Sequence, residues 1–72
     1  MSAPYLARRV VRIVGDPRWG GGVRQDHIRE LTGCDRKTLR AAIAIAYRRG
    51  QVDICWSWIV APAPARREVK AA

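Results

Sequence analysis

The sequence predicts a mainly α-helical fold with a small β element: three helices, followed by a C-terminal β-hairpin or a single strand. Three observations lead to this prediction. Apolar residues recur every three to four positions in three stretches before residue 50, which is the period of a helix with one buried face. Glycine or proline separates these stretches. After Gly50 the apolar period shortens to two, which is typical of a strand.

The charge of the chain favours a polyanionic partner. The 72 residues suit one small domain, and their formal charge is +8 at pH 7. Lysine and arginine that neutralise phosphates release condensed counterions, so nucleic acid is the first candidate and an acidic membrane surface the second. No apolar run approaches the roughly 20 residues of a transmembrane helix, and no signal peptide is evident. We expect a cytoplasmic protein without membrane insertion.

The first helix is expected to begin at Tyr5, after a disordered lead of residues 1–4, and to end at Gly15 in the left-handed cap conformation. Its buried side is expected to contain Leu6, Val10, Ile13 and Val14. Arginines lie on the opposite side: Arg8, Arg9 and Arg12. They form either a phosphate contact or a solvated face, and we favour the solvated face.

Residues 15–22 are expected to form a loop, because this segment contains four glycines and a proline. Trp19 is expected to dock it on the core. The loop lacks the GK[ST] ending of a phosphate-binding P-loop, and it has room for a short first strand.

The second helix is expected over residues 25–31, with Ile28 and Leu31 turned inward and Gly33 ending it. Asp35 is placed as the N-cap of a third helix that begins at Arg36 and ends at Gly50. The inward positions of this helix are Leu39, Ala42, Ile43 and Ala46. The opposite side collects Lys37, Arg40, Ala41, Ala44 and Arg48.

The segment after Gly50 fits one long strand or a hairpin folded near Trp56 and Ser57, and we favour the hairpin because a lone strand has no partner. Trp56 and Trp58 share a face in the alternating pattern and are expected in the core. If the hairpin is short, one of them marks a partner surface. Residues 62–72 are expected to be a disordered basic tail, which either strengthens nucleic-acid binding or solubilises the chain.

Few residues suggest catalysis or metal binding. Cys34 and Cys55 have no CxxC spacing and are expected to be reduced and buried, with an intermolecular disulfide as the alternative. His27 has no partner in metal spacing and is expected at the surface. We therefore expect no cofactor, no metal and no enzymatic activity.

Residues 23–52 resemble the winged helix-turn-helix of small bacterial and phage transcription regulators, GntR-type domains among them. The resemblance rests on an apolar second helix, a turn glycine, a cap, the run TLRAAI and a glycine before the first wing strand. The matching residues are Ile28, Leu31, Gly33, Thr38, Leu39, Arg40, Ala42, Ile43, Gly50 and Val52. Three positions depart from the pattern: Arg24 and Asp35 replace the usual small or hydroxyl residues before each helix, and Ala46 replaces a bulky apolar residue.

The resemblance implies that residues 5–61 form a winged helix-turn-helix domain whose third helix enters the major groove of double-stranded DNA. The implied base-reading residues are Arg36, Lys37 and Arg40, with Ala41 and Ala44 offering at most a methyl contact to thymine. The implied phosphate contacts are Arg24, Arg29, Thr38 and Arg48.

Two functions remain open at this point. The first is DNA binding by a minimal transcription regulator, or by an excisionase-like recombination factor of a phage or mobile element. The second is a protein-interaction winged helix that binds a host polymerase or regulator, for which Ala41, Ala44, Ile45 and the tryptophans would supply the surface. We expect no small-molecule effector, and a homodimer is possible because two-fold DNA sites usually demand one.

Overall fold

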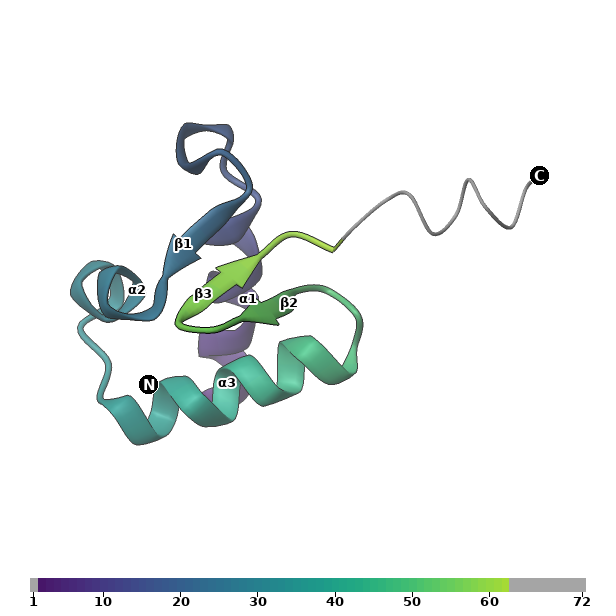
Figure 1. Cartoon of the computed structure of the whole chain (residues 1–72). Coiled ribbons are helices and arrows are strands. Elements are labelled where there is room, and N and C mark those ends of the chain that lie inside the picture. The colour runs from purple at the N-terminus through teal and green to yellow at the C-terminus, as the bar shows by residue number, and fades with distance from the viewer. Residues whose placement is uncertain (1, 63–72) are drawn as a thin grey trace.

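The fold class agrees with the prediction, since the structure is mainly helical with a small antiparallel sheet. The structure is a computed structural model that describes residues 2–62, so the predicted tail beyond Pro62 lies outside the described residues. Its elements in chain order are α1 (Ala3–Val14), a 3₁₀ helix η1 (Pro17–Trp19), β1 (Gly22–Arg24), α2 (Gln25–Thr32), α3 (Arg36–Arg48), β2 (Asp53–Cys55) and β3 (Trp58–Val60). Figure 1 shows the strands in front of α1, with α2 at one end of the sheet and α3 crossing below it.

Helix α1 differs from the prediction at both ends. It begins at Ala3, two residues early, because Ser2 is its N-cap and accepts a hydrogen bond from the Tyr5 N–H. Proline fits this first turn, where an N–H would have no helical partner. The expected left-handed cap at Gly15 is wrong, because its φ of −78° and ψ of −6° are right-handed.

The turn between α2 and α3 forms as predicted. Gly33 ends α2 with a φ of 70°, and its N–H donates to the Arg29 carbonyl at 2.7 Å. Asp35 is the N-cap of α3, and its side chain accepts from the Thr38 N–H. These two caps fix where α2 stops and α3 starts.

The core is aliphatic and lies between α1, α3 and the inner face of the sheet. Its buried residues are Leu6, Ala7, Val10, Val14, Val23, Ile28, Leu39, Ala42, Ile43, Ala46, Val52 and Ile59. Fully burying a side chain such as that of Ile28 or Ile59 contributes roughly 1.5–3 kcal/mol. The predicted inward faces of α1 and α3 are therefore largely confirmed, with Ile13 only half-buried at the edge. Leu31 was predicted inward, but it is 44% exposed because α2 buries only Ile28.

The sheet contains three antiparallel strands in the order β1–β3–β2. The hairpin alternative is confirmed, since β2 pairs with β3 and the chain reverses through Trp56 and Ser57. The loop before α2 does supply a strand, because β1 pairs with the other edge of β3. Among residues 2–62, no helix is long and apolar enough to span a membrane.

The expectation that both hairpin tryptophans belong to the core is wrong. Trp56 is 92% exposed and Trp58 is 44% exposed. The pairing explains this result, because Ile54 lies opposite Ile59 and Cys55 lies opposite Trp58. Ile59 therefore takes the inner face, and Trp58 points to the outer face.

Trp56 occupies the first central position of the two-residue turn with a φ of 58°. Glycine is usual at a position with positive φ there, because a Cβ in the left-handed region costs about 1–2 kcal/mol. Among the described residues, Trp56 is the one non-glycine residue with positive φ. The turn therefore retains backbone strain under a side chain that is almost fully in solvent.

We predict that Trp56→Gly unfolds at higher urea concentration than Trp56→Ala, by about 1 kcal/mol in the free energy of unfolding. Both variants remove the exposed ring, so the comparison isolates the backbone. The same pair at Ser57, the second central position, should show the usual order with alanine more stable. An alanine variant at position 56 as stable as the glycine variant would contradict a strained turn.

Candidate nucleic-acid interface

The exposed side of α3 gathers the predicted base-reading residues. Arg36, Lys37, Arg40 and Ala41 are exposed, and Ala44 is partly exposed. The buried residues of α3 lie on its opposite side and anchor the helix to the core. The helix itself contains no acidic residue. Its outer side is therefore a positively charged ridge on a rigid element.

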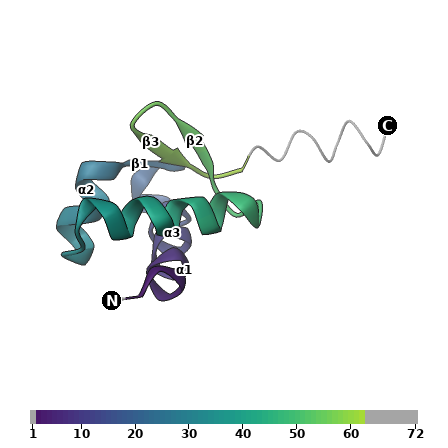
Figure 2. The ribbon, with the colours of Figure 1, turned by 90° about the horizontal axis from the view of Figure 1, so that it is seen from below.

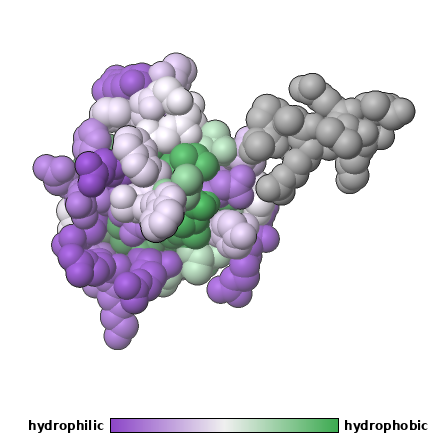
Figure 3. All heavy atoms as spheres, in the orientation of Figure 1, coloured by the Kyte–Doolittle hydropathy of each residue, from purple (hydrophilic) through white to green (hydrophobic). Residues whose placement is uncertain are grey.

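This ridge is not uniform. Alanines occupy its middle, between the arginines and lysine of the first turns and Arg48 at the end. Figure 3 shows the same division, with hydrophilic surface at both ends of α3 and hydrophobic surface between them. Small side chains permit close approach of a partner, but they offer no hydrogen bonds to base edges.

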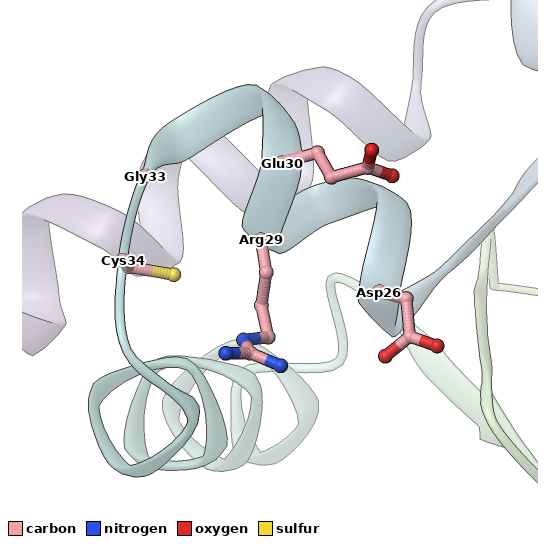
Figure 4. Close-up of a pocket in the computed structure, with 5 residues that line it drawn as sticks. All are labelled: Asp26, Arg29, Glu30, Gly33 and Cys34. Atoms are coloured by element: carbon pink, nitrogen blue, oxygen red, sulfur yellow. The ribbon is translucent and has the colours of Figure 1, made fainter.

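Arg29 extends from α2 toward the first turns of α3 (Figure 4). It lines a hollow of about 360 Å³ at the turn, together with Asp26, Glu30, Gly33 and Cys34. Its Nε atom is buried and has no hydrogen-bond partner among the described residues. A buried donor of this kind is usually satisfied by an acceptor. The hollow that Arg29 lines also contains two carboxylates, those of Asp26 and Glu30.

Arg24 lies on the outer face of the sheet, the same face as Trp58. Its guanidinium carbon is 6.0 Å from the centroid of the Trp58 ring, and the two residues are register partners on neighbouring strands. The pair is a cation–π contact, which holds the exposed guanidinium in place. Arg24 makes no side-chain cap on α2, because a guanidinium has no hydrogen-bond acceptor.

Thr38, a phosphate contact implied by the resemblance, hydrogen-bonds to the N-cap residue of its own helix. Its hydroxyl donates to the Asp35 carboxylate, and its backbone N–H donates to the same side chain at 3.3 Å. These two bonds, the hydroxyl bond first, lower the pKa of Asp35 below its ordinary value of 3.8. The one O–H donor of Thr38 is already used, so we leave this residue out of the proposed interface.

The exposed aromatic side chains were not recognised from the sequence as a group. Tyr47 is 52% exposed at the end of α3, and Tyr5 is 49% exposed on α1. His27 is half-buried rather than at the surface, because its ring meets Trp19 edge-on at 4.6 Å. A useful indication was present in the sequence: five aromatic residues exceed what so small an aliphatic core requires.

The cysteines are free thiols, as predicted, but only Cys34 is partly buried. Cys55 was expected to be buried and is exposed on the outer face of the sheet. Within residues 2–62, no group of three or more His, Cys, Asp or Glu residues could hold a metal ion.

Comparison with known proteins does not identify a family. Neither the family models, nor the curated proteins, nor the solved structures gave a match to this chain.

We predict that Thr38→Val raises the pKa of Asp35 toward 3.8 and lowers the stability of the protein at pH 7. A carboxylate with a depressed pKa stabilises the fold above its unfolded pKa and loses this contribution as the pH falls through the folded pKa. The difference in thermal midpoint between wild type and variant should therefore shrink below pH 3.8. NMR titration of the Asp35 carboxyl carbon measures the pKa, and thermal unfolding at pH 7 and below pH 3.8 measures the difference in stability.

Thr32→Val is the matched control, since the Thr32 hydroxyl donates to a backbone carbonyl, that of Ile28, and to no carboxylate. The loss of stability in Thr32→Val should be the same at pH 7 and below pH 3.8. An unchanged pKa of Asp35 in Thr38→Val would contradict the assignment.

Proposed function

We propose that this protein binds double-stranded DNA, with α3 in the major groove. The observation that supports the proposal best is the exposed ridge of α3, where Arg36, Lys37 and Arg40 project from a helix that is anchored by its other side. The major groove is about 12 Å wide and admits an α-helix. Arginine pairs with guanine through two hydrogen bonds, so these residues suit base edges.

The flanking arginines suit the DNA backbone. Arg29 lies beside the turn between α2 and α3, Arg24 is held over Trp58 beside the hairpin, and Arg48 is exposed at the far end of α3. Such contacts position a protein on the duplex without specifying sequence. Direct readout is then modest, because Ala41 and Ala44 separate the base-reading residues from Arg48.

The arrangement of elements gives further support. Two helices are joined by a tight turn, a strand precedes α2 where winged domains often have their first strand, and a hairpin follows α3. A minimal winged helix-turn-helix of this kind would act by occupying DNA, as a transcription regulator or as a recombination or excision factor of a phage or mobile element.

We predict that the affinity for a short duplex falls with salt, with a slope near −0.9 in log K against log[salt] for each phosphate neutralised. Lys37→Gln/Arg40→Gln should weaken binding at least about tenfold and reduce the slope by up to about two units. Arg8→Gln/Arg12→Gln on α1 is the charge-matched control, and it should weaken binding of one duplex less than about threefold, since these side chains are remote from α3. Fluorescence anisotropy at several salt concentrations measures the affinity and the salt slope of wild type and of both variants.

Two results would overturn the proposal. One is an absence of binding at low salt, or a slope near zero. The other is an equal loss of affinity in the α1 and α3 variants, which would mean that overall charge alone, and not α3, drives binding.

The alternative function is a protein-interaction module, favoured by the apolar surface over β2 and β3 (Figure 3). Trp56 and Trp58 are 92% and 44% exposed on the hairpin, and Ile54 is 46% exposed on its edge strand. A partner captured from lysate after nuclease treatment, and lost in Trp56→Ala, would support this function over DNA binding. A partner that is lost with nuclease would count against it.

A further inference from the structure

A second basic surface lies on the outer side of α1. Two adjoining hollows, of about 440 Å³ and 250 Å³, share Arg9, Arg12 and Ile13 as lining residues. The first reaches Tyr5 and Arg8 at one end, and the second reaches Arg18 and Trp19 at the other. We call this surface, with its lining Arg8, Arg9, Arg12, Arg18, Tyr5 and Trp19, the α1 groove.

The α1 groove has a large excess of positive charge. Its one acidic lining residue is Asp16, which accepts a contact from Arg18 at 3.8 Å. Among residues 2–62 this is the one ion pair, so Arg8, Arg9 and Arg12 have no acidic partner there. Arg8 and Arg12 are one turn apart and exposed, about 6 Å along the helix axis.

The groove and the ridge of α3 point away from each other. Helix α1 packs its buried side, which includes Leu6 and Val10, against the core that it shares with α3. At about 100° per residue, Arg8 and Arg12 fall on the opposite side of α1. The buried side of α3 likewise faces this core, so Lys37 and Arg48 point outward from it. The outer sides of two packed helices are about 20 Å apart.

We propose that the α1 groove binds a second segment of double-stranded DNA, so that one protein molecule bridges two segments. This proposal rests on the proposed function of α3. A straight duplex held in contact with α3 cannot also reach Arg8 and Arg12, because the thickness of both helices separates them. Arg8 and Arg12 can therefore release counterions only from the phosphates of a second DNA segment, or from a duplex that bends back on itself.

The distribution of side chains in the α1 groove favours DNA over an acidic protein. Protein interfaces have an apolar centre and a charged rim. In the groove, two of the three residues shared by both hollows are arginines, Arg9 and Arg12, and the third is the half-buried Ile13, so charge is not confined to the rim. Arginine forks bind phosphate oxygens through paired hydrogen bonds, which suits a phosphate backbone that crosses the groove.

A bridging assay tests the proposal with the full-length protein. One duplex is attached to beads, a second fluorescent duplex of unrelated sequence is added, and the protein-dependent capture of the second duplex is measured. Wild type should capture it, and Arg8→Gln/Arg12→Gln should reduce capture at least about tenfold while its affinity for a single duplex changes less than about threefold. Lys37→Gln/Arg40→Gln should reduce both the capture and the affinity for a single duplex at least about tenfold. Circular dichroism and thermal unfolding establish that the variants, all at exposed positions, remain folded.

The outcomes separate the two proposals. Wild type that binds one duplex but captures no second one overturns the bridging proposal and leaves the function of α3 intact. Wild type that binds no duplex overturns both. Capture that persists in Arg8→Gln/Arg12→Gln would assign bridging to protein dimers, which sedimentation of the free protein would detect. Polyglutamate that abolishes capture without displacing the first duplex would assign the α1 groove to an acidic protein.

Discussion

The packing of α1 against α3 is the constraint on which the other features depend. Each helix commits one aliphatic side to the shared core, which includes Leu6 and Val10 from α1 and Leu39 and Ile43 from α3. Each helix must then direct its cations away from the other, because an unpaired buried charge would cost far more than the core could offset. Two basic surfaces on different sides of so small a molecule follow from this single packing arrangement. Figure 2 shows the ribbons of the two helices crossing. The same arrangement places the sheet at one edge of the core, where Val23 and Ile59 close it.

The aromatic residues of the described chain lie outside the buried core. No aromatic side chain is among the buried core residues, and Trp19 is the one tryptophan that packs against them in part. The space between two helices and a three-stranded sheet is filled by valine, leucine, isoleucine and alanine, which leaves the larger rings on the surface. Trp56 is the extreme case, because it combines almost complete exposure with a strained backbone. Strained residues of this kind cluster at functional sites, which makes the hairpin turn a candidate contact of either proposed function.

Much of the fold could be predicted from the sequence, because helix periodicity, Gly33 and Asp35 are local features. The errors came from positions where local pattern and tertiary pairing disagree. In an unbroken strand, Ile54, Trp56 and Trp58 would share one face. A two-residue turn reverses this relation, so that Ile54 pairs with Ile59, and Trp58 changes faces.

Leu31 has correct spacing for a buried face, but α2 is short and nothing covers its last turn, so Leu31 lies at the rim of the α1 groove. The ridge of α3 was predictable for the same reason as the helix, whereas the α1 groove depends on η1 and α2 meeting α1, which no local pattern encodes.

The nature of both basic surfaces bears on the choice between a regulator with a defined operator and an architectural protein. Sequence selection requires several side chains that hydrogen-bond to base edges, and α3 offers three cations followed by alanines. The arginines of the α1 groove face a phosphate backbone in the proposed complex, and such contacts are indifferent to sequence. Most of the binding free energy would then come from counterion release, which is nearly the same for every duplex. A protein with modest selectivity on one side and none on the other is better suited to hold two DNA segments together than to distinguish one operator from a genome. If α3 binds DNA as proposed, these surfaces would suit a recombination or excision factor better than a transcription regulator.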